Sequence, residues 1–273
     1  MGSVRERLEH YGLAPSKARG QNFLASLATA ERIVDQVEIG ADDAAVEGGP
    51  GLGDLTRAVA ARARRVIALE IDRGLVELLA DAELPECVEV RHQDVLKADL
   101  GGISRELGAP AVLIGNLPYV IAGRFLGSLL GPRTPFRRWG FMLQSEVAER
   151  VIAEPDTPGY GPLAVWTRIW TRAEIVLELS ANEFVPKPKV RSSFVVFDPL
   201  CEAPEIVDVP LLRELVRGSF RHRRKTLRAA LRKRFPEIEA ALESAGVDSQ
   251  RRAETLDPRE FIAIASELSQ KRS

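Results

Sequence analysis

Cysteine and histidine are scarce in this chain of 273 residues. The two cysteines, Cys87 and Cys201, lie far apart and form no C-x-x-C pair, so neither a disulfide framework nor a zinc site is indicated. The three histidines, His10, His92 and His222, show no spacing typical of metal ligands or of a catalytic pair. We therefore expect no bound metal.

Long apolar runs are also missing. Residues 1–19 contain no apolar core of the kind found in signal peptides, and no run is long enough to cross a membrane. We expect a cytoplasmic protein without membrane contact. The length predicts one or two domains, and a hydrophobic content of 45% is enough for a well-packed core.

The most informative stretch is Asn116-Leu117-Pro118-Tyr119, which follows an apolar run at 111–114. Such a run is typical of a buried parallel strand, and open α/β sheets bind ligands at the carboxyl ends of their strands. The asparagine amide offers a donor and an acceptor, the proline fixes the backbone, and the tyrosine supplies an aromatic face. This group could bind a planar ring that carries an amine, such as adenine. A simple strand-ending turn is the alternative, because Asn and Pro are common in turns.

A glycine-rich loop lies upstream, between a short expected strand at 44–47 and a helical pattern that starts near residue 55. Its glycines, Gly49, Gly51 and Gly53, allow positive φ and close approach of the backbone to a ligand. Their spacing is tighter than G-x-G-x-x-G, and Pro50 removes an N–H that a pyrophosphate could use. The loop therefore favours a nucleoside-bearing cofactor without phosphates over NAD.

Two further expected strands end in acids. Glu70 follows the strand at 65–69, roughly 20 residues after the glycines, where this architecture binds ribose hydroxyls. Asp94 follows the segment 88–93, although a strand-end turn or a helix cap would also explain it. The two acids, the glycine loop and Asn116 are all expected at the same edge of the sheet.

These motifs, in this order, resemble the ribosomal RNA adenine N6,N6-dimethyltransferases of the KsgA/RsmA type along nearly the whole chain. The resemblance rests on six segments: 20–24 (GQNFL), 47–53 (EGGPGLG), 116–119 (NLPY), 141–147 (FMLQSEV), 184–192 (FVPKPKVRS) and 223–228 (RRKTLR). The chain departs from the family pattern at Gly48, Val120 and Ala229. We expect Gly48 to loosen the strand end, and Val120 to remove a polar contact.

The resemblance implies an α/β fold, namely a Rossmann-like class I methyltransferase with a mostly parallel seven-stranded sheet and a small all-helical C-terminal domain. The methyltransferase domain is expected at 1–200, with a lead-in at 1–40, and the helical domain at 201–273. Strands are expected near 139–143, 175–179 and 194–198, and helices at 4–11, 28–37, 211–234, 237–244 and 258–268. Nothing suggests an obligate dimer, so a monomer is expected.

The implied cofactor is S-adenosyl-L-methionine, bound by Asn22, Leu24, Gly49, Gly51, Glu70, Asp94 and Asn116. From the chemistry of the site, the Asn116 side chain and a backbone carbonyl near Leu117 would accept the N–H groups of the target amine. Pro118 completes the motif, and Tyr119 would stack on the target base. By resemblance, Phe184 closes the other face of the base, although core packing is its alternative role. Trp139, Trp166 and Trp170 are assigned to packing.

Nine basic residues between 217 and 234 follow one another without an acid, although the net charge of the chain is only −1. Apolar residues are interleaved at helical spacing, so this segment is expected to be an amphipathic helix with a cationic face. A solvated surface is the alternative to contact with phosphates. The residues expected to bind RNA are Lys187, Lys189, Arg221, Arg223, Arg224, Lys225 and Arg228.

The implied function is transfer of methyl groups to the N6 amines of two adjacent adenosines near the 3′ end of small-subunit ribosomal RNA during ribosome biogenesis, with the small subunit as partner. Two alternatives stay open. One is a large-subunit RNA adenine N6-methyltransferase that confers macrolide-type resistance, and the other is a non-catalytic nucleic-acid-binding relative.

Overall fold

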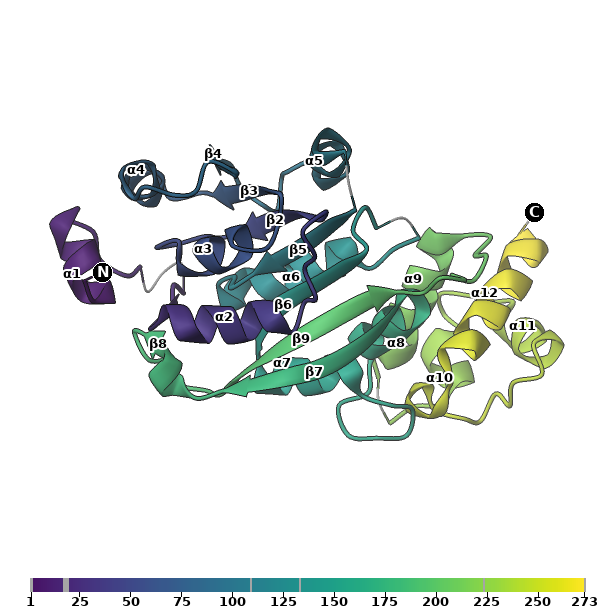
Figure 1. Cartoon of the computed structure of the whole chain (residues 1–273). Helices are drawn as coiled ribbons and strands as arrows, with labels where there is room; N and C mark the ends of the chain where they lie inside the picture. Colours follow the sequence, from purple (N-terminus) through teal and green to yellow (C-terminus); the bar gives the residue numbers. More distant parts are fainter. Residues whose placement is uncertain (1, 17–19, 109, 133, 223, 273) are drawn as a thin grey trace. The chain divides into compact units, whose positions relative to one another are not determined.

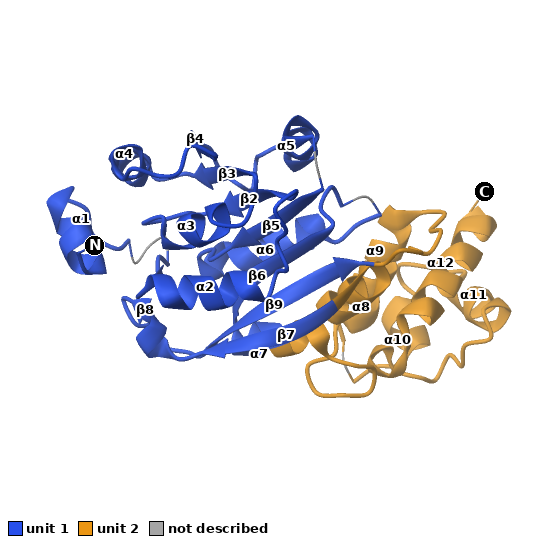
Figure 2. Ribbon diagram, viewed as in Figure 1, with its two compact units in different colours: residues 1–148, 173–199 blue, residues 149–172, 200–273 orange. Residues whose placement is uncertain are grey.

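The computed structural model describes residues 2–16, 20–108, 110–132, 134–222 and 224–272. The chain forms two compact units, one of residues 1–148 and 173–199 and the other of residues 149–172 and 200–273 (Figure 2). The expected domain boundary near residue 200 stays a prediction, and the segment 149–172 clusters with the second unit. No helix among the described residues is long and apolar enough to span a membrane.

A seven-stranded sheet forms the centre of the first unit, as the sequence predicts, with the order β4-β3-β2-β5-β6-β9-β7 (Figure 1). Strands β4, β3, β2, β5 and β6 pair in parallel, and β9 pairs antiparallel with β6. The strands are β2 (Ala44–Gly48), β3 (Arg65–Glu70), β4 (Val88–His92), β5 (Ala111–Gly115), β6 (Arg138–Gln144), β7 (Thr171–Leu179) and β9 (Ser192–Pro199). The central strands β2 and β5 are fully buried and rich in alanine, valine, leucine and isoleucine.

The register of the parallel strands brings the sequence motifs to one edge. Gly48, the last residue of β2, pairs with Leu69 of β3 on one side and with Gly115 of β5 on the other. The glycine loop, Glu70 and Asn116 therefore start at the same level of the sheet. The expectation that Gly48 loosens this strand end is wrong, because the strand stays paired on both sides. A Cβ at this position would meet Leu117 Cδ2 and Val95 Cγ2, each at 3.2 Å, so the glycine leaves room for those side chains.

Helices cover both faces of the sheet. One apolar cluster joins α2 (Leu27–Asp35) and α3 (Asp54–Ala60) to strand residues that include Met142 of β6. The preceding residue of β6, Phe141, packs edge-on against Phe125 of α6 (Tyr119–Leu129), with 5.3 Å between the ring centroids. Because adjacent strand residues point to opposite faces, α6 lies on the face opposite to α2 and α3. The first unit also contains α1 (Val4–His10), α4 (Arg73–Asp81), α5 (Leu100–Leu107) and the first residues of α7 (Ser145–Ile152).

A small second sheet was not expected from the sequence. Strands β1 (Phe23–Leu24) and β8 (Phe184–Val185) pair antiparallel, so that Leu24 faces Phe184 across the pair. A 3-10 helix, η1 (Ala181–Glu183), precedes β8. This pair fastens the segment around Asn22 to the loop that carries Lys187 and Lys189. Two-residue strands leave too little periodicity in a sequence to be recognised.

The second unit is helical apart from the first residues of β7. Its helices are α8 (Pro162–Trp170), α9 (Val209–Phe220), α10 (Leu227–Leu231), α11 (Ile238–Ser244) and α12 (Pro258–Arg272), with the 3-10 helix η2 (Ala253–Thr255). The prediction of one helix over 211–234 is wrong. The α9 helix ends at Phe220, and a new helix starts where the Thr226 side chain accepts the backbone N–H of Ala229 at 3.3 Å. That N-cap, hidden within a basic run, divides the segment.

Candidate active site

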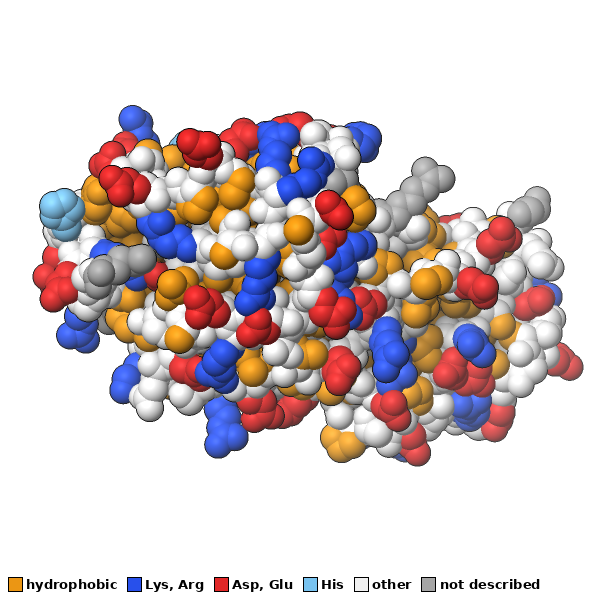
Figure 3. Space-filling model, viewed as in Figure 1, with side chains coloured by type: hydrophobic (Ala, Val, Ile, Leu, Met, Phe, Trp, Pro, Cys, Tyr) orange, Lys and Arg blue, Asp and Glu red, His pale blue; other side chains and the backbone are white. Residues whose placement is uncertain are grey.

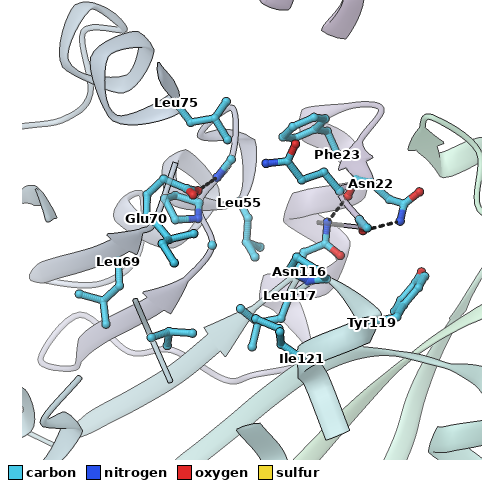
Figure 4. A pocket seen from close by; sticks show the side chains of 18 of the residues that line it. Asn22, Phe23, Leu55, Leu69, Glu70, Leu75, Asn116, Leu117, Tyr119 and Ile121 are labelled. Atoms are coloured by element: carbon cyan, nitrogen blue, oxygen red, sulfur yellow. Dashed lines mark hydrogen bonds between the residues drawn. The ribbon is translucent and has the colours of Figure 1, made fainter. Parts of the chain in front are cut away.

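A cavity of about 400 Å³ opens at the carboxyl edge of the sheet in the first unit. It is lined by the glycine loop, by the residues that follow β3, β4 and β5, and by the segment 20–24. Figure 4 shows Glu70 on one side of this space and Asn116 and Tyr119 on the other. The lining includes the residues that the sequence analysis assigns to the cofactor and to the catalytic motif: Asn22, Leu24, Gly49, Gly51, Glu70, Asp94 and Asn116 through Tyr119.

The glycine loop, residues 48–53, forms part of the cavity wall and depends on backbone conformations that favour glycine. Gly49, Gly51 and Gly53 all have positive φ, at 70°, 58° and 83°. At Gly51 an added Cβ would also lie 3.0 Å from the Phe23 ring. Any L side chain there would be strained and would push on the aromatic residue that borders the cavity. The backbone can thus come close to a ligand only because this position is glycine.

Glu70 is fixed by the loops beside it. One carboxylate oxygen accepts the N–H of Gly51 at 3.2 Å, and the other accepts the N–H of Asp72 at 2.9 Å. The side chain is 5% exposed, and this burial raises the pKa of Glu70 above its ordinary value. Each oxygen keeps further acceptor capacity, so the carboxylate suits the paired hydroxyls of a ribose.

Asn116 is oriented by the N-terminal segment. Its amide nitrogen donates to the backbone carbonyl of Asn22 at 2.8 Å (Figure 4). Asn22 is in turn held by its own side chain, which donates to the carbonyl of Gly20 at 3.0 Å. Since one amide hydrogen of Asn116 is used in this way, the side-chain oxygen is left as the acceptor for a donor in the cavity. An exocyclic amine is such a donor.

The rest of the motif forms the wall beside Asn116. Leu117 is 3% exposed, and Pro118 stands at the N-cap of α6. The Tyr119 hydroxyl hydrogen-bonds the Ser192 hydroxyl of β9, and burial raises the pKa of this tyrosine. The ring is thereby held at the cavity as a neutral aromatic surface. Val120 follows Tyr119 and is 71% exposed, and the expected loss of a polar contact there stays a prediction.

Asp94 and Leu24 also line this cavity. One Asp94 oxygen accepts the N–H of Leu96 at 2.9 Å, which is the turn geometry considered as the alternative for this residue. The other oxygen is 4.0 Å from the Lys97 amine. Leu24 is buried. Contacts of these two residues with a cofactor stay predictions.

Phe184 is placed differently from its expected role. Its ring is fully buried in the apolar cluster that contains Leu24, Ile33 and Met142, and it does not line the cavity. Core packing, the alternative, describes its position in the structure. Stacking on a target base would require the ring to leave this cluster, so that role stays a prediction. The three tryptophans assigned to packing are all buried, which confirms that assignment.

The residues expected to bind RNA lie in both units. Lys187 and Lys189 are exposed in the first unit, and Arg221, Arg224 and Lys225 are exposed in the second. Arg228 forms an ion pair with Glu239 at 2.6 Å, so part of its charge is neutralised within the chain. Arg223 lies outside the described residues. RNA contact by any of them stays a prediction.

An ion pair that was not expected from the sequence joins the lead-in helix to the start of α3, directly after the glycine loop. The Arg7 guanidinium of α1 donates two hydrogen bonds, of 2.6 and 3.2 Å, to the carboxylate of Asp54, the first residue of α3. The Asp54 side chain is only 7% exposed and lines the cavity. Contacts between residues 47 positions apart carry no local pattern that could have announced them.

Replacing Arg7 with Ala should destabilise the protein by about 2 kcal/mol, because Asp54 would keep a buried carboxylate without its partner. Thermal unfolding would show this as a lower Tm. The matched control is Arg5→Ala on the exposed side of the same helix, which should leave Tm unchanged. Equal Tm values for the two variants would mean that the pair does not anchor α1.

Glu47 lies at the end of β2, fully buried, and neither carboxylate oxygen has a hydrogen-bond partner among the described residues. Burial, with a smaller contribution from the charges of Glu70 and Asp54, raises the pKa of Glu47 to about 8. The neighbouring Thr56 opposes this shift only in part. Glu47 is therefore protonated at neutral pH and carries no charge beneath the loop.

This proton makes the stability of the protein depend on pH. The unfolded chain releases it near pH 4.5, whereas the folded protein holds it up to about pH 8. The free energy of unfolding should fall as the pH rises through this window, by at most about 1.4 kcal/mol per pH unit from this group. Urea unfolding of Glu47→Gln at pH 5 and pH 8 should show a smaller fall than the wild type. Glu243→Gln, at an exposed site, serves as control, and an equal fall in all three proteins would contradict this account.

The residues present fit a nucleoside cofactor with a methionine tail. The close approach at Gly51, the buried acceptor Glu70 and the apolar walls from Leu55, Leu69 and Leu75 suit a sugar and a flat ring. No group of three or more His, Cys, Asp or Glu side chains within the described ranges could hold a metal ion.

Comparison with known proteins agrees with this site. The model of the family described as "Ribosomal RNA adenine dimethylase" matches residues 15–270. Ribosomal RNA small subunit methyltransferase A of Geobacillus kaustophilus is 39% identical over 98% of this chain and 96% of its own length. Among solved structures, a dimethyladenosine transferase from Plasmodium falciparum shares the fold, with a TM-score of 0.79 at 23% identity over 92% of this chain and 98% of its own.

The 23S rRNA methyltransferase ErmE has a TM-score of 0.66 at 28% identity over 91% of this chain and all of its own. Both structures share the fold described above, a class I methyltransferase fold with a mostly parallel seven-stranded sheet. A match that spans nearly the whole chain, together with the Asn116 site, shows that the chain belongs to the ribosomal RNA adenine dimethylase family.

Proposed function

We propose that this protein methylates the N6 amines of two adjacent adenosines near the 3′ end of small-subunit ribosomal RNA, with the small subunit as its partner in the cytoplasm. The observation that carries the proposal is the orientation of Asn116. Its nitrogen is occupied by the Asn22 carbonyl, so its oxygen is the acceptor that an adenine amine would meet. The relatives named above supply the choice of the small subunit.

The chemistry of the target explains why an oriented acceptor is needed. The lone pair of the adenine amine is delocalised into the ring, which makes the nitrogen a poor nucleophile. Acceptance of its N–H groups by Asn116 Oδ1 and by a backbone carbonyl near Leu117 concentrates electron density on the nitrogen. Tyr119 would stack on the base, and stacking of roughly 1–3 kcal/mol helps to offset removal of the base from its RNA context.

Glu70, Gly49 and Gly51 would hold S-adenosylmethionine, with Asp94 near its adenine and Asn22 and Leu24 near its methionine end. When bound, this cofactor supplies an already activated methyl group. The residues of the chain therefore contribute position and electrostatics rather than a strong base. The amine keeps one N–H after the first transfer, so Asn116 can orient it for a second.

The test is to supply labelled S-adenosylmethionine together with unmethylated small subunits or, in parallel, large-subunit RNA. Label in the small-subunit RNA alone is the expected result. Label in large-subunit RNA would support the resistance-type methyltransferase instead. Label in neither, with cofactor bound in a separate titration, would support a non-catalytic nucleic-acid-binding protein.

A further inference from the structure

Ser192 is a buried polar residue to which the proposed chemistry assigns no role. It is the last residue of the motif at 184–192, and only 1% of its surface is exposed. A buried hydroxyl needs a hydrogen-bond partner, and here the partner is the hydroxyl of Tyr119, 73 residues earlier in the chain. Because the ring of Tyr119 would stack on the target base, this contact joins the serine to the reaction.

The backbone of Ser192 is held firmly by the central sheet. Ser192 begins β9, which lies between β6 and β7 in the strand order, and it pairs with Gln144 at the end of β6. The preceding residue, Arg191, accepts the backbone N–H of Ser145 at 3.0 Å. The serine hydroxyl is therefore presented from a rigid element with a neighbouring strand on each side, not from a loop.

Tyr119 is thereby fixed at both of its ends. Its backbone is the first residue of α6, directly after Pro118 at the N-cap, and its phenol oxygen is bound by Ser192. The ring between these two points lines the cavity, on the same side as Asn116 (Figure 4). Without the bond at the oxygen, rotation about the side-chain torsions could turn the ring into other staggered positions. Ser192 thus selects one orientation of the aromatic face.

The other catalytic side chain is fastened to the same segment. Asn116 donates to the carbonyl of Asn22 at 2.8 Å, and the residues after Asn22 form β1, which pairs with β8 at the start of the motif at 184–192. The β8 end of this motif therefore supports the amide, and the Ser192 end supports the ring. Since both groups that would hold the adenine depend on one segment, their relative positions are set before a base enters the cavity.

We propose that Ser192 is a positioning residue for methyl transfer, which holds the Tyr119 ring in the orientation that aligns the stacked adenine with the cofactor. This inference rests on the proposed function, because it needs a base on the ring. A phenyl ring without the bond would still offer an aromatic face, so the bond contributes less to binding of the base than to the alignment of its amine. Loss of the bond should therefore lower the rate of transfer more than the affinity for the particle.

Ser193 provides a matched control within the same strand. It is also 1% exposed, but its hydroxyl bonds with the hydroxyl of Ser145 at 2.9 Å rather than with Tyr119. Because both serines are buried and uncharged, their replacement leaves unchanged the acidic and basic side chains that are interspersed over the surface, one face of which Figure 3 shows. A change in rate could then not be a change in electrostatic attraction to RNA.

The experiment compares Ser192→Ala, Tyr119→Phe, the variant with both substitutions and Ser193→Ala. Single-turnover methylation of unmethylated small subunits is followed over a range of particle concentrations, with Tm and cofactor affinity measured for each protein. Ser192→Ala and Tyr119→Phe should each lower the maximal rate about 10-fold, less than the roughly 10²-fold cost of a ~1 Å misplacement, at an unchanged half-saturating concentration. The double variant should be no slower than either single variant, because both substitutions remove the same hydrogen bond. Ser193→Ala should match the wild type.

The hold on the ring can also be read without RNA. The chain contains three tyrosines, so a protein labelled with ¹³C at the hydroxyl-bearing ring carbon gives one NMR signal from each, and Tyr119→Phe identifies the signal of Tyr119. Ser192→Ala should shift this signal and leave those of Tyr11 and Tyr160 in place. Ser193→Ala should leave all three in place.

An unchanged rate for Ser192→Ala would overturn the proposal, as would a double variant whose loss is the product of the two single losses. An equal loss for Ser193→Ala would also overturn it, because the rate would then reflect packing of the strand rather than the bond to Tyr119. Should Ser192→Ala unfold, Tyr119→Phe removes the same bond from the other side, and its rate decides in the same way. If the wild type methylates no ribosomal RNA, the proposed function fails, yet the tyrosine signals still decide whether Ser192 holds the ring, and an unshifted Tyr119 signal would refute that hold.

Discussion

Asn116→Ala is expected to reduce the rate of methyl transfer by about 10³-fold, the loss typical when one oriented polar contact at the reacting group is removed. The side chain joins two parts of the site, because its nitrogen donates to Asn22 and its oxygen is left for the target amine. Alanine provides neither. Single-turnover methylation of small subunits measures the effect on chemistry, while particle binding should stay within a few-fold of the wild type.

The control for this variant is Asn182→Ala, at an exposed position outside the cavity, which should leave the rate and the Tm unchanged. A variant of Asn116 that loses particle binding and Tm in proportion to its rate would contradict the catalytic role. Asn116 would then be a structural residue that fastens the segment around Asn22.

Glu70→Ala should weaken binding of S-adenosylmethionine by about 100-fold. A hydrogen bond to a charged group contributes about 1.5–3 kcal/mol, and two ribose hydroxyls would share this carboxylate. The substitution also frees the N–H groups of Gly51 and Asp72, which loosens the loop that must lie against the cofactor. Isothermal titration gives the dissociation constant directly, without RNA.

Glu70→Gln should fall between the wild type and Glu70→Ala, because the amide keeps an acceptor but loses the charge. Glu77→Ala, on the exposed side of α4 where it pairs with Arg73, should bind the cofactor normally. A dissociation constant for Glu70→Ala within a few-fold of the wild type would place the ribose elsewhere in the cavity.

Much of the first unit could be predicted from the sequence because its central strands β3 and β5 are buried apolar runs, each ending in or followed by a polar residue. The apolar run at 111–114 followed by Asn116 is the clearest example. Parallel strands place such ends at one edge of a sheet, so the order of motifs was enough to gather Glu70 and Asn116 around one cavity.

Other features depend on contacts between residues distant in the chain. The Arg7–Asp54 pair and the β1–β8 pairing show no local periodicity, and the buried position of Phe184 follows from that pairing. The break at Thr226 had a local signal, a threonine N-cap, but it was obscured by the helical spacing of residues on both sides.

The most direct test of the proposed function is the identity of the methylated nucleoside. Unmethylated small subunits are incubated with the wild-type protein and S-adenosylmethionine, the ribosomal RNA is digested, and nucleosides are quantified by mass spectrometry over time. The proposed function predicts N6,N6-dimethyladenosine that rises to two per particle, with none in the Asn116→Ala reaction. Accumulation of methylated nucleosides other than N6-methylated adenosine, or no methylation while the cofactor is bound, would contradict it.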